Sequence, residues 1–147
     1  MTGESFSEFA RKRLFEPAGM TRTLYLDDPT VLVPNRATGY QEIWHTGQFH
    51  RFELRGTTVG PFGLRTTLND MVRWDRNFRN NKVEAGPHFK EFLQTGCLIG
   101  NRRCLESFPE PTYRGARRNW YTGGVPGFMA QFVRFPDHGL AIIVLSN

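Results

Sequence analysis

The sequence predicts an α+β fold, in which an antiparallel sheet is flanked by helices, in a single domain over residues 1–147. The length, with 39% hydrophobic residues, 15 Gly and 9 Pro, suits one compact domain. Aromatic and β-branched runs bounded by Gly and Pro gather in the last third, which is typical of strands. Apolar residues at helical spacing occur before them. We therefore expect the sheet late in the chain, covered on one side by helices that start near Ser5, Thr67 and Pro87.

The first expected helix begins at Ser5, because Ser5 and Glu8 have the spacing of a capping box. Its apolar positions recur at helical spacing and are Phe6, Phe9, Ala10 and Leu14. Basic residues occupy the other side, which predicts an amphipathic surface helix. Pro17 and Gly19 are expected to end it.

The middle of the chain predicts less regular structure. Residues 20–40 show no sustained period and are expected to form an ordered loop. Polar and apolar residues roughly alternate over 41–54, which favours a solvent-facing hairpin or a long excursion. A second helix is expected to start at Thr67, which begins a cap-like sequence. A short third helix is expected over 87–94, with proline in its first turn.

Three strands are expected in the last third, over 119–122, 129–135 and 140–146. The connection over 136–139 has proline early and glycine last, which favours a hairpin between the last two strands. Residues 140–145 are apolar without alternation. This pattern predicts a central strand that is buried on both faces.

Charge and hydropathy exclude some classes of protein. The net charge is +5 and 16 of the 19 basic residues are Arg, which raises the pI without naming a partner. The longest aliphatic run, 140–145, is far shorter than the ~20 residues that cross a bilayer. Residues 1–8 have neither a basic nor an apolar signal region, so we expect no export signal in this chain, and its compartment stays open.

The cysteines and histidines do not form a recognisable metal or redox motif. Six residues separate Cys97 from Cys104; a disulfide is sterically allowed, but two unconnected thiols are expected. The histidines are scattered, at His45, His50, His88 and His138. We expect neither a metal nor a cofactor.

Three segments carry the pattern of one known family: residues 5–20, residues 63–71, and residues 120–128 with the hairpin that follows them to Asn147. They resemble the serine β-lactamase-like family of class C β-lactamases, D-alanyl-D-alanine carboxypeptidases and related esterases, whereas 41–60 and 98–118 match poorly. The resemblance implies a partial β-lactamase/DD-peptidase-like fold that lacks the family's N-terminal strands and C-terminal helix. On this expectation the chain is a C-terminal fragment. Part of the apolar surface of 140–145 would then be uncovered, so the isolated chain should be unstable or form a homo-oligomer.

In this family a Ser-x-x-Lys motif places the nucleophile and its base one helical turn apart. The three lysines here, Lys12, Lys82 and Lys90, are preceded at that spacing by phenylalanine, arginine and proline. The family's Tyr-x-Asn or Ser-x-Asn motif is also missing from the sequence. The resemblance thus implies acyl-enzyme hydrolysis of a small-molecule amide, β-lactam or ester, with no activity expected from this chain alone.

The third family motif is represented by Tyr121, Thr122 and Gly123, followed by Gly124. By resemblance, this strand lies along the substrate and the Gly124 amide donates to the developing oxyanion. Tyr121 stands where relatives carry Lys or His, which removes a fixed positive charge for a substrate carboxylate. An equally weighted reading takes the local aromatic residues as ordinary strand and turn residues. The sequence His45-Thr46-Gly47 spells a variant of the motif but lies upstream of its expected place.

Two further functions stay open at this point. A non-catalytic remnant could use the surviving strand to bind a ligand or a partner. A basic cluster with neighbouring Tyr113 and Trp120 is compatible with nucleic-acid binding, although a solvated basic loop explains it more simply. The cluster consists of Arg102, Arg103, Arg114, Arg117 and Arg118.

Overall fold

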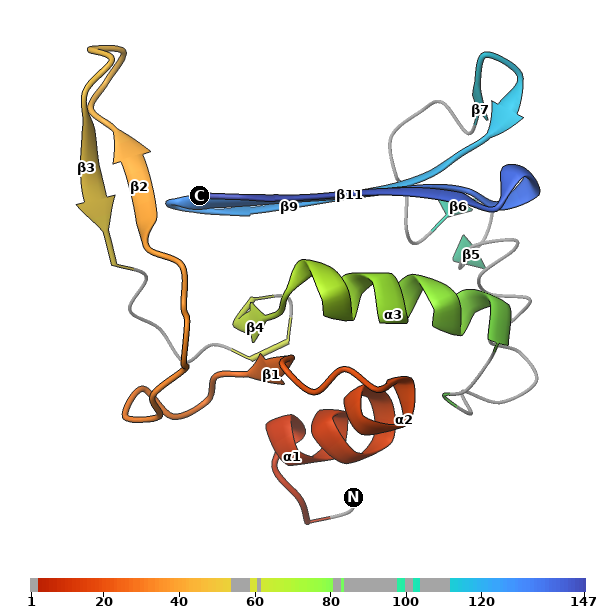
Figure 1. The fold of residues 1–147 in the computed structure, drawn as a ribbon, viewed down its shortest axis with the longest axis horizontal. Helices are drawn as coiled ribbons and strands as arrows, with labels where there is room; N and C mark the ends of the chain where they lie inside the picture. The colour runs from red at the N-terminus through yellow and green to blue at the C-terminus, as the bar shows by residue number, and fades with distance from the viewer. Residues whose placement is uncertain are drawn as a thin grey trace.

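A three-stranded antiparallel sheet, in the order β11-β10-β9, dominates the computed structural model (Figure 1). The structure describes residues 3–53, 59–60, 62–80, 83, 98–99, 102–103 and 112–147. The strands are β9 (Asn119–Val125), β10 (Phe128–Phe135) and β11 (Leu140–Ser146). Phe132 on β10 pairs with Tyr121 on one side and with Ile143 on the other. The three strands predicted for the last third are confirmed, and so is the α+β class.

Helix α3 (Leu68–Asn80) lies along one face of this sheet (Figure 1). The Phe78 and Phe132 ring centroids lie 6.3 Å apart across the interface. The Arg134 Nε donates to Asp75 Oδ1 at 2.7 Å, and the side chains are only 10% and 8% exposed. Helix and sheet are therefore joined by an aromatic contact and by a buried ion pair.

The predicted start of α3 is confirmed by its cap and by a buried carboxylate in its first turn. The Thr67 hydroxyl accepts from the Asp70 backbone N–H at 3.2 Å. Asp70 is fully buried and accepts from the Arg22 N–H and from the Thr23 hydroxyl, both at 2.8 Å. Arg73 donates to its other oxygen at 2.7 Å. Asp70 thus holds the loop after the first helix against α3.

The first helical segment comprises α1 (Phe6–Ala10), the π-helical turn η1 (Arg11–Phe15) and α2 (Glu16–Ala18). Its predicted cap is confirmed, because the Ser5 Oγ accepts from the Glu8 N–H at 3.2 Å. The π turn shifts the hydrogen-bond register just before Pro17, which has no N–H to donate and lies inside the helix. The helix ends at Gly19 (φ 75°), where the Met20 N–H bonds to the Phe15 carbonyl at 2.8 Å.

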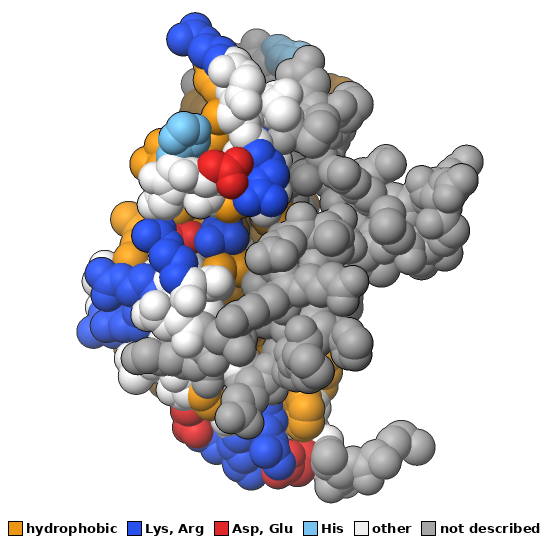
Figure 2. Space-filling view, turned by 90° about the vertical axis from the view of Figure 1, so that its right-hand side faces the viewer, with side chains coloured by type: hydrophobic (Ala, Val, Ile, Leu, Met, Phe, Trp, Pro, Cys, Tyr) orange, Lys and Arg blue, Asp and Glu red, His pale blue; other side chains and the backbone are white. Residues whose placement is uncertain are grey.

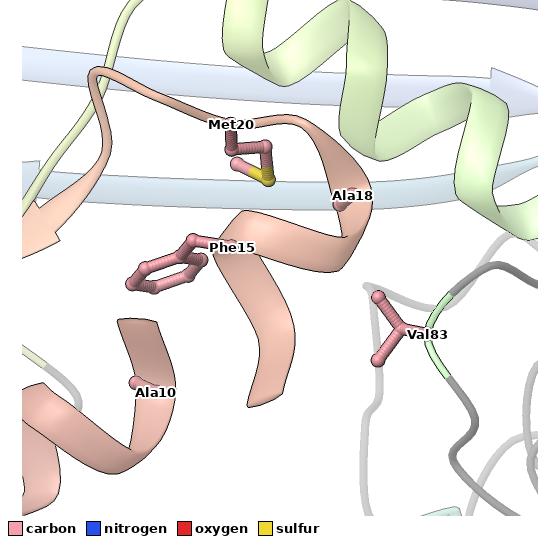
Figure 3. Close-up of a cluster of buried hydrophobic side chains, with 5 residues drawn as sticks. All are labelled: Ala10, Phe15, Ala18, Met20 and Val83. Atoms are coloured by element: carbon pink, nitrogen blue, oxygen red, sulfur yellow. The ribbon is translucent and has the colours of Figure 1, made fainter. Parts of the chain in front are cut away.

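The main hydrophobic cluster lies between this segment and α3, away from the sheet. It consists of Ala10, Phe15, Ala18, Met20 and Val83 (Figure 3). Trp74 of α3 packs against it. The prediction that the first helix covers the sheet is wrong: α3 separates the two, because Trp74 faces the cluster while Phe78 contacts the sheet. The helix expected over 87–94 lies outside the described residues.

Short antiparallel pairs complete the described architecture. Strands β2 (Gly39–Glu42) and β3 (Phe49–Phe52) form the hairpin that was predicted within 41–54. The other pairs are β1 (Leu24–Tyr25) with β4 (Leu64–Arg65), β5 (Leu98–Ile99) with β6 (Arg102–Arg103), and β7 (Thr112–Tyr113) with β8 (Ala116–Arg117). The expectation of a loop throughout 20–40 is therefore wrong at Leu24–Tyr25, whose strand forms by pairing with a distant segment. It is also wrong at Gly39 and Tyr40, which begin β2.

The predicted central position of the last strand is wrong. Among the described residues β11 pairs with β10 alone, and Leu140, Ile142 and Val144 on its outer face are 52%, 48% and 48% exposed. Ile143 shares the inner face with Phe132. A continuous apolar run gives apolar side chains to both faces, but only tertiary contacts decide whether both are covered. The predicted hairpin connection is confirmed, with a 3-10 turn over Pro136–His138 and Gly139 at φ 61°.

Candidate active-site strand

The four candidate residues Tyr121, Thr122, Gly123 and Gly124 all lie on β9, at one side of the described sheet. Within the described ranges β9 pairs with β10 only. Residues 126 and 127 connect the two strands, and Gly127 has φ 81°, which is typical of the third position of a type II turn with proline in its second position. The candidate residues therefore stand beside a tight turn, and no described strand pairs with the other side of β9, which we call its open side.

The hairpin register sets the direction of each β9 amide. Val125 pairs with Phe128 across the two-residue turn, and Gly124 pairs with Met129 next along the strand. In an antiparallel hairpin of this kind the pair beside the turn exchanges hydrogen bonds, and the following pairs alternate. On this alternation the N–H and C=O groups of Gly124 and Thr122 point away from β10. They form the outward-facing donors and acceptors of the strand.

Two consecutive glycines leave this part of the strand without side chains. A Cβ added at Gly123 would meet no atom of the described residues within 4 Å, apart from its chain neighbours. A Cβ added at Gly124 would lie 2.7 Å from the Met129 sulfur, so the Met129 side chain fills the space that Gly124 leaves. Gly123 thus allows a second molecule to approach the backbone closely, whereas Gly124 accommodates its cross-strand neighbour.

Tyr121 presents a neutral hydrogen-bonding group on the face of the sheet that α3 covers. Its ring stacks on Phe132 with centroids 6.3 Å apart, and the residue is 38% exposed. Burial raises the pKa of the Tyr121 phenol, while the Arg134 charge acts in the opposite direction. The phenol therefore stays protonated at neutral pH and is able to donate a hydrogen bond.

A charged network fixes β10, and with it the partner strand of Tyr121. Asp75 accepts from Arg134 and, at 3.0 Å, from Arg79, which also donates to the Gly139 carbonyl at 2.8 Å. The Arg134 guanidinium lies 4.0 Å from the Phe78 ring centroid. Sequence reasoning missed Asp75 and Arg134, because 59 positions separate them and no motif joins them.

A hollow of about 160 Å³ lies at the base of the β2–β3 hairpin, next to the β9–β10 turn. Its charged lining residues are Arg36, Arg51 and Glu53, and the Phe52 and Phe128 rings form apolar walls. A Cβ added at Gly127 would lie 3.0 Å from the Gly39 Cα, which shows how closely the turn and β2 approach each other. No sequence motif marks this hollow, because its lining comes from three separate segments.

The other candidate segments occupy different places. His45, Thr46 and Gly47 form the turn of the β2–β3 hairpin, with His45 at φ 59° and the Thr46 hydroxyl donating to the Ile43 carbonyl at 2.6 Å. They are not on the sheet, as their position in the sequence indicated. Among the described residues no group of three or more His, Cys, Asp or Glu is placed to hold a metal ion. Cys97 and Cys104 lie outside the described residues.

The three members of the basic cluster with described side chains, Arg114, Arg117 and Arg118, are engaged with the protein itself. Arg114 and Arg118 lie 5.5 and 5.7 Å from the Tyr113 ring centroid, and Arg118 also lies 5.3 Å from that of Trp120. Arg117 pairs with Asp137 at 2.7 Å. Lys and Arg side chains gather on the described part of the face that Figure 2 shows, which is the right-hand side of Figure 1. The aromatic faces that would stack on bases are thus partly occupied by guanidinium groups.

No helix in the described part of the chain is long and apolar enough to cross a membrane.

Similarity to known proteins adds information that these contacts do not contain. A D-aminopeptidase of Gluconobacter oxydans (strain 621H) is 33% identical over 75 residues, which make up 51% of this chain and 14% of that protein. The chain therefore spans a small part of the curated relative that it matches.

The fold has a close structural counterpart. The structure of the octameric penicillin-binding protein homologue from Pyrococcus abyssi superposes with a TM-score of 0.81 at 18% identity. The match covers 99% of this chain and 34% of that one, so the chain spans about a third of its neighbour. A family model described as Beta-lactamase matches residues 1–147. The chain belongs to the β-lactamase family.

Proposed function

We propose that the chain supplies the oxyanion-side strand of a serine hydrolase that cleaves an amide, β-lactam or ester through an acyl-enzyme. The observation that carries this proposal is the open side of β9, where the register directs the Gly124 N–H away from β10. The serine nucleophile and its base come from sequence outside these 147 residues. Membership of the β-lactamase family supports the reaction class.

The proposed chemistry needs a donor where negative charge develops. When a serine oxygen attacks the substrate carbonyl, its proton passes to the base and the carbonyl oxygen becomes an oxyanion. The Gly124 N–H donates to that oxyanion, and the outward carbonyl and amide of Thr122 align the substrate along the strand. Removing one such donor typically lowers kcat by about 10²- to 10³-fold. Gly123 lets the two backbones approach.

Among the three substrate classes, the relative named D-aminopeptidase favours an amide. The solved neighbour is described as octameric. Together with the exposed outer face of β11, this supports self-association of the present chain. We propose a homo-oligomer that uses this face.

The proposal is tested first on the chain itself. The purified 147-residue protein should hydrolyse neither nitrocefin nor p-nitrophenyl acetate, and neither penicillin nor a fluorophosphonate should label it. Intact-mass spectrometry checks the labelling. Acylation of any of the four serines, Ser5, Ser7, Ser107 and Ser146, would contradict the proposal.

The decisive test uses the natural reading frame that encodes this chain, extended upstream. The longer protein should contain Ser-x-x-Lys and should be labelled by fluorophosphonate. In that protein Gly124→Pro removes the outward N–H and should slow acylation about 10²-fold or more, whereas the matched Gly124→Ala adds a Cβ and keeps the N–H. Equal acylation rates for the two variants would sink the role of the Gly124 amide.

The rival function, a non-catalytic ligand-binding module, makes a different prediction. It predicts that a ligand raises the melting temperature of the longer protein without any covalent adduct. Nucleic-acid binding predicts salt-dependent oligonucleotide affinity that falls when Arg114 is replaced by Gln. Neither outcome is expected from a hydrolase.

A further inference from the structure

We infer that the hollow at the base of the β2–β3 hairpin binds a carboxylate of the substrate, so that the preferred substrates are acidic peptides or related acidic acyl compounds. This inference rests on the proposed function, because it places the substrate backbone along β9. It assigns a specificity role to Arg36 and Arg51, which the sequence motifs do not include.

The position of the hollow puts it within reach of a substrate on β9. The β9–β10 turn packs against Gly39, and Phe128, the first residue of β10, lines the hollow. The hollow therefore lies beyond the Val125 end of β9, which is the end that carries Gly123 and Gly124. An extended chain advances by about 3.3 Å per residue, so a substrate that pairs with β9 reaches this end within a few residues.

The charge around the hollow favours an anion. Arg36 and Arg51 line it, and Glu53 offsets one of their charges. Arg36 and Glu53 each interact within the chain, and both act on an anion in the hollow through their charges. Arg65 does not line the hollow, but its guanidinium lies near that of Arg36: burial lowers the pKa of Arg65, and the charge of Arg36 lowers it further. The Arg65 Nη2 is buried and makes no hydrogen bond to any described residue. An anion would relieve the repulsion between these guanidinium groups.

The shape and lining favour a carboxylate on a short apolar stem. The hollow measures about 160 Å³, and the Phe52 and Phe128 rings provide apolar walls beside the charged groups. The Arg51 guanidinium presents two parallel N–H donors that match the two oxygens of a carboxylate, and Arg36 adds its charge. Tyr121 carries no charge at neutral pH, so the arginines of the hollow take over the recognition of an acidic group that a lysine or histidine at position 121 would provide.

The experiment measures binding at equilibrium and needs no catalysis. Two pairs of probes separate the sources of the carboxylate. One pair is N-acetyl-Ala-Ala-Ala with a free C-terminus and its C-terminal amide; the other is N-acetyl-Ala-Ala-Glu-amide and its Gln counterpart. Isothermal titration calorimetry at low salt gives Kd for each peptide. At least one acidic member should bind about tenfold more tightly than its neutral match.

Variants assign that preference to the hollow. Arg51→Gln, on an exposed strand of the hairpin, and Arg36→Gln should each reduce the tenfold preference to about twofold or less. Arg13→Gln removes the same charge from an exposed helical position and should leave the preference unchanged. Circular dichroism checks that each variant folds, and Arg51→Gln alone decides the matter if Arg36→Gln unfolds.

Equal affinities within both probe pairs, a failure of all four peptides to bind, or an undiminished preference in Arg51→Gln would overturn the inference. Failure of the proposed hydrolase is read separately, from labelling of the longer protein. A carboxylate preference without any labelling would remove the hydrolase and leave the binding site.

Discussion

The two outer strands of the described sheet have opposite character. Strand β9 carries Gly123 and Gly124, so its backbone is accessible from the open side. Strand β11 is aliphatic, and its outer face exposes about half of Leu140, Ile142 and Val144. Both strands pair with the same β10, so the sheet itself does not create the difference.

This difference separates two kinds of recognition. A strand with two glycines and outward-facing amides suits a small molecule that must lie close to the backbone. A strand that bears exposed apolar side chains suits contact with another polypeptide, because burying apolar surface stabilises the complex by about 25 cal/mol per Å². We therefore propose substrate contact for β9 and protein contact for β11.

The largest expected effect comes from the buried ion pair that holds β10, the strand with which both outer strands pair. Asp75→Ala leaves the buried Arg134 without its ion-pair partner and should lower the free energy of unfolding by about 3–5 kcal/mol. Asp137→Ala, which breaks an exposed pair with Arg117, should cost less than about 1 kcal/mol. Urea denaturation compares the two, and similar losses would show that β10 is not held by the buried pair.

The next effect tests the role of β11. Ile142→Asp places a charge in the exposed apolar face and should weaken self-association about tenfold or more. Leu32→Asp makes the same kind of change at a loop residue that is 91% exposed and should have no effect. Sedimentation velocity over a range of concentrations measures the association. A wild-type chain that stays monomeric and melts cooperatively would contradict the assignment.

A smaller effect is expected far from both outer strands. Ser5→Ala removes the N-cap hydroxyl of α1 and should destabilise the protein by about 1 kcal/mol. Ser7→Ala removes a hydroxyl that is buried and has no hydrogen-bond partner among the described residues, so it should be neutral or slightly stabilising. Thermal unfolding followed by circular dichroism distinguishes these outcomes. A larger loss for Ser7→Ala would contradict the assigned cap.

The smallest effect concerns the ionisation of Tyr121. Its pKa in the folded protein lies above the ordinary value of 10.0, mainly because of burial. The folded state therefore holds this proton more tightly than the unfolded state, and the associated stability is complete below pH 10 and is lost as the pH rises through the folded pKa. Tyr121→Phe should make the fall in unfolding free energy above pH 10 less steep. An unchanged slope between pH 9 and 11 would count against a shifted phenol.

Local signals in the sequence predict most of the elements. The caps at Ser5 and Thr67, the three last strands and the β2–β3 hairpin all depend on residues that are close in sequence. The β1–β4 pairing and the packing of α3 between two layers depend on distant contacts, which no local pattern contains. The exposure of β11 is also a tertiary property, because an apolar run does not record what covers it.

The candidate site divides in the same way. Tyr121 to Gly124 are consecutive, so their motif is readable, and the hairpin register then gives each amide a direction. Asp75 and Arg134 meet only in the folded chain. The hollow combines Arg36, Arg51 and Phe128 from three segments, and sequence inspection had no reason to group them.

The direction of the Gly124 amide is the central claim, and amide hydrogen exchange followed by NMR tests it on this chain directly. The register predicts alternation along β9: the Thr122 and Gly124 amides should exchange fast, whereas the Tyr121 and Gly123 amides should be protected by β10. Protected amides at 122 and 124, with fast exchange at 121 and 123, would show that Gly124 points into the sheet and donates to no substrate.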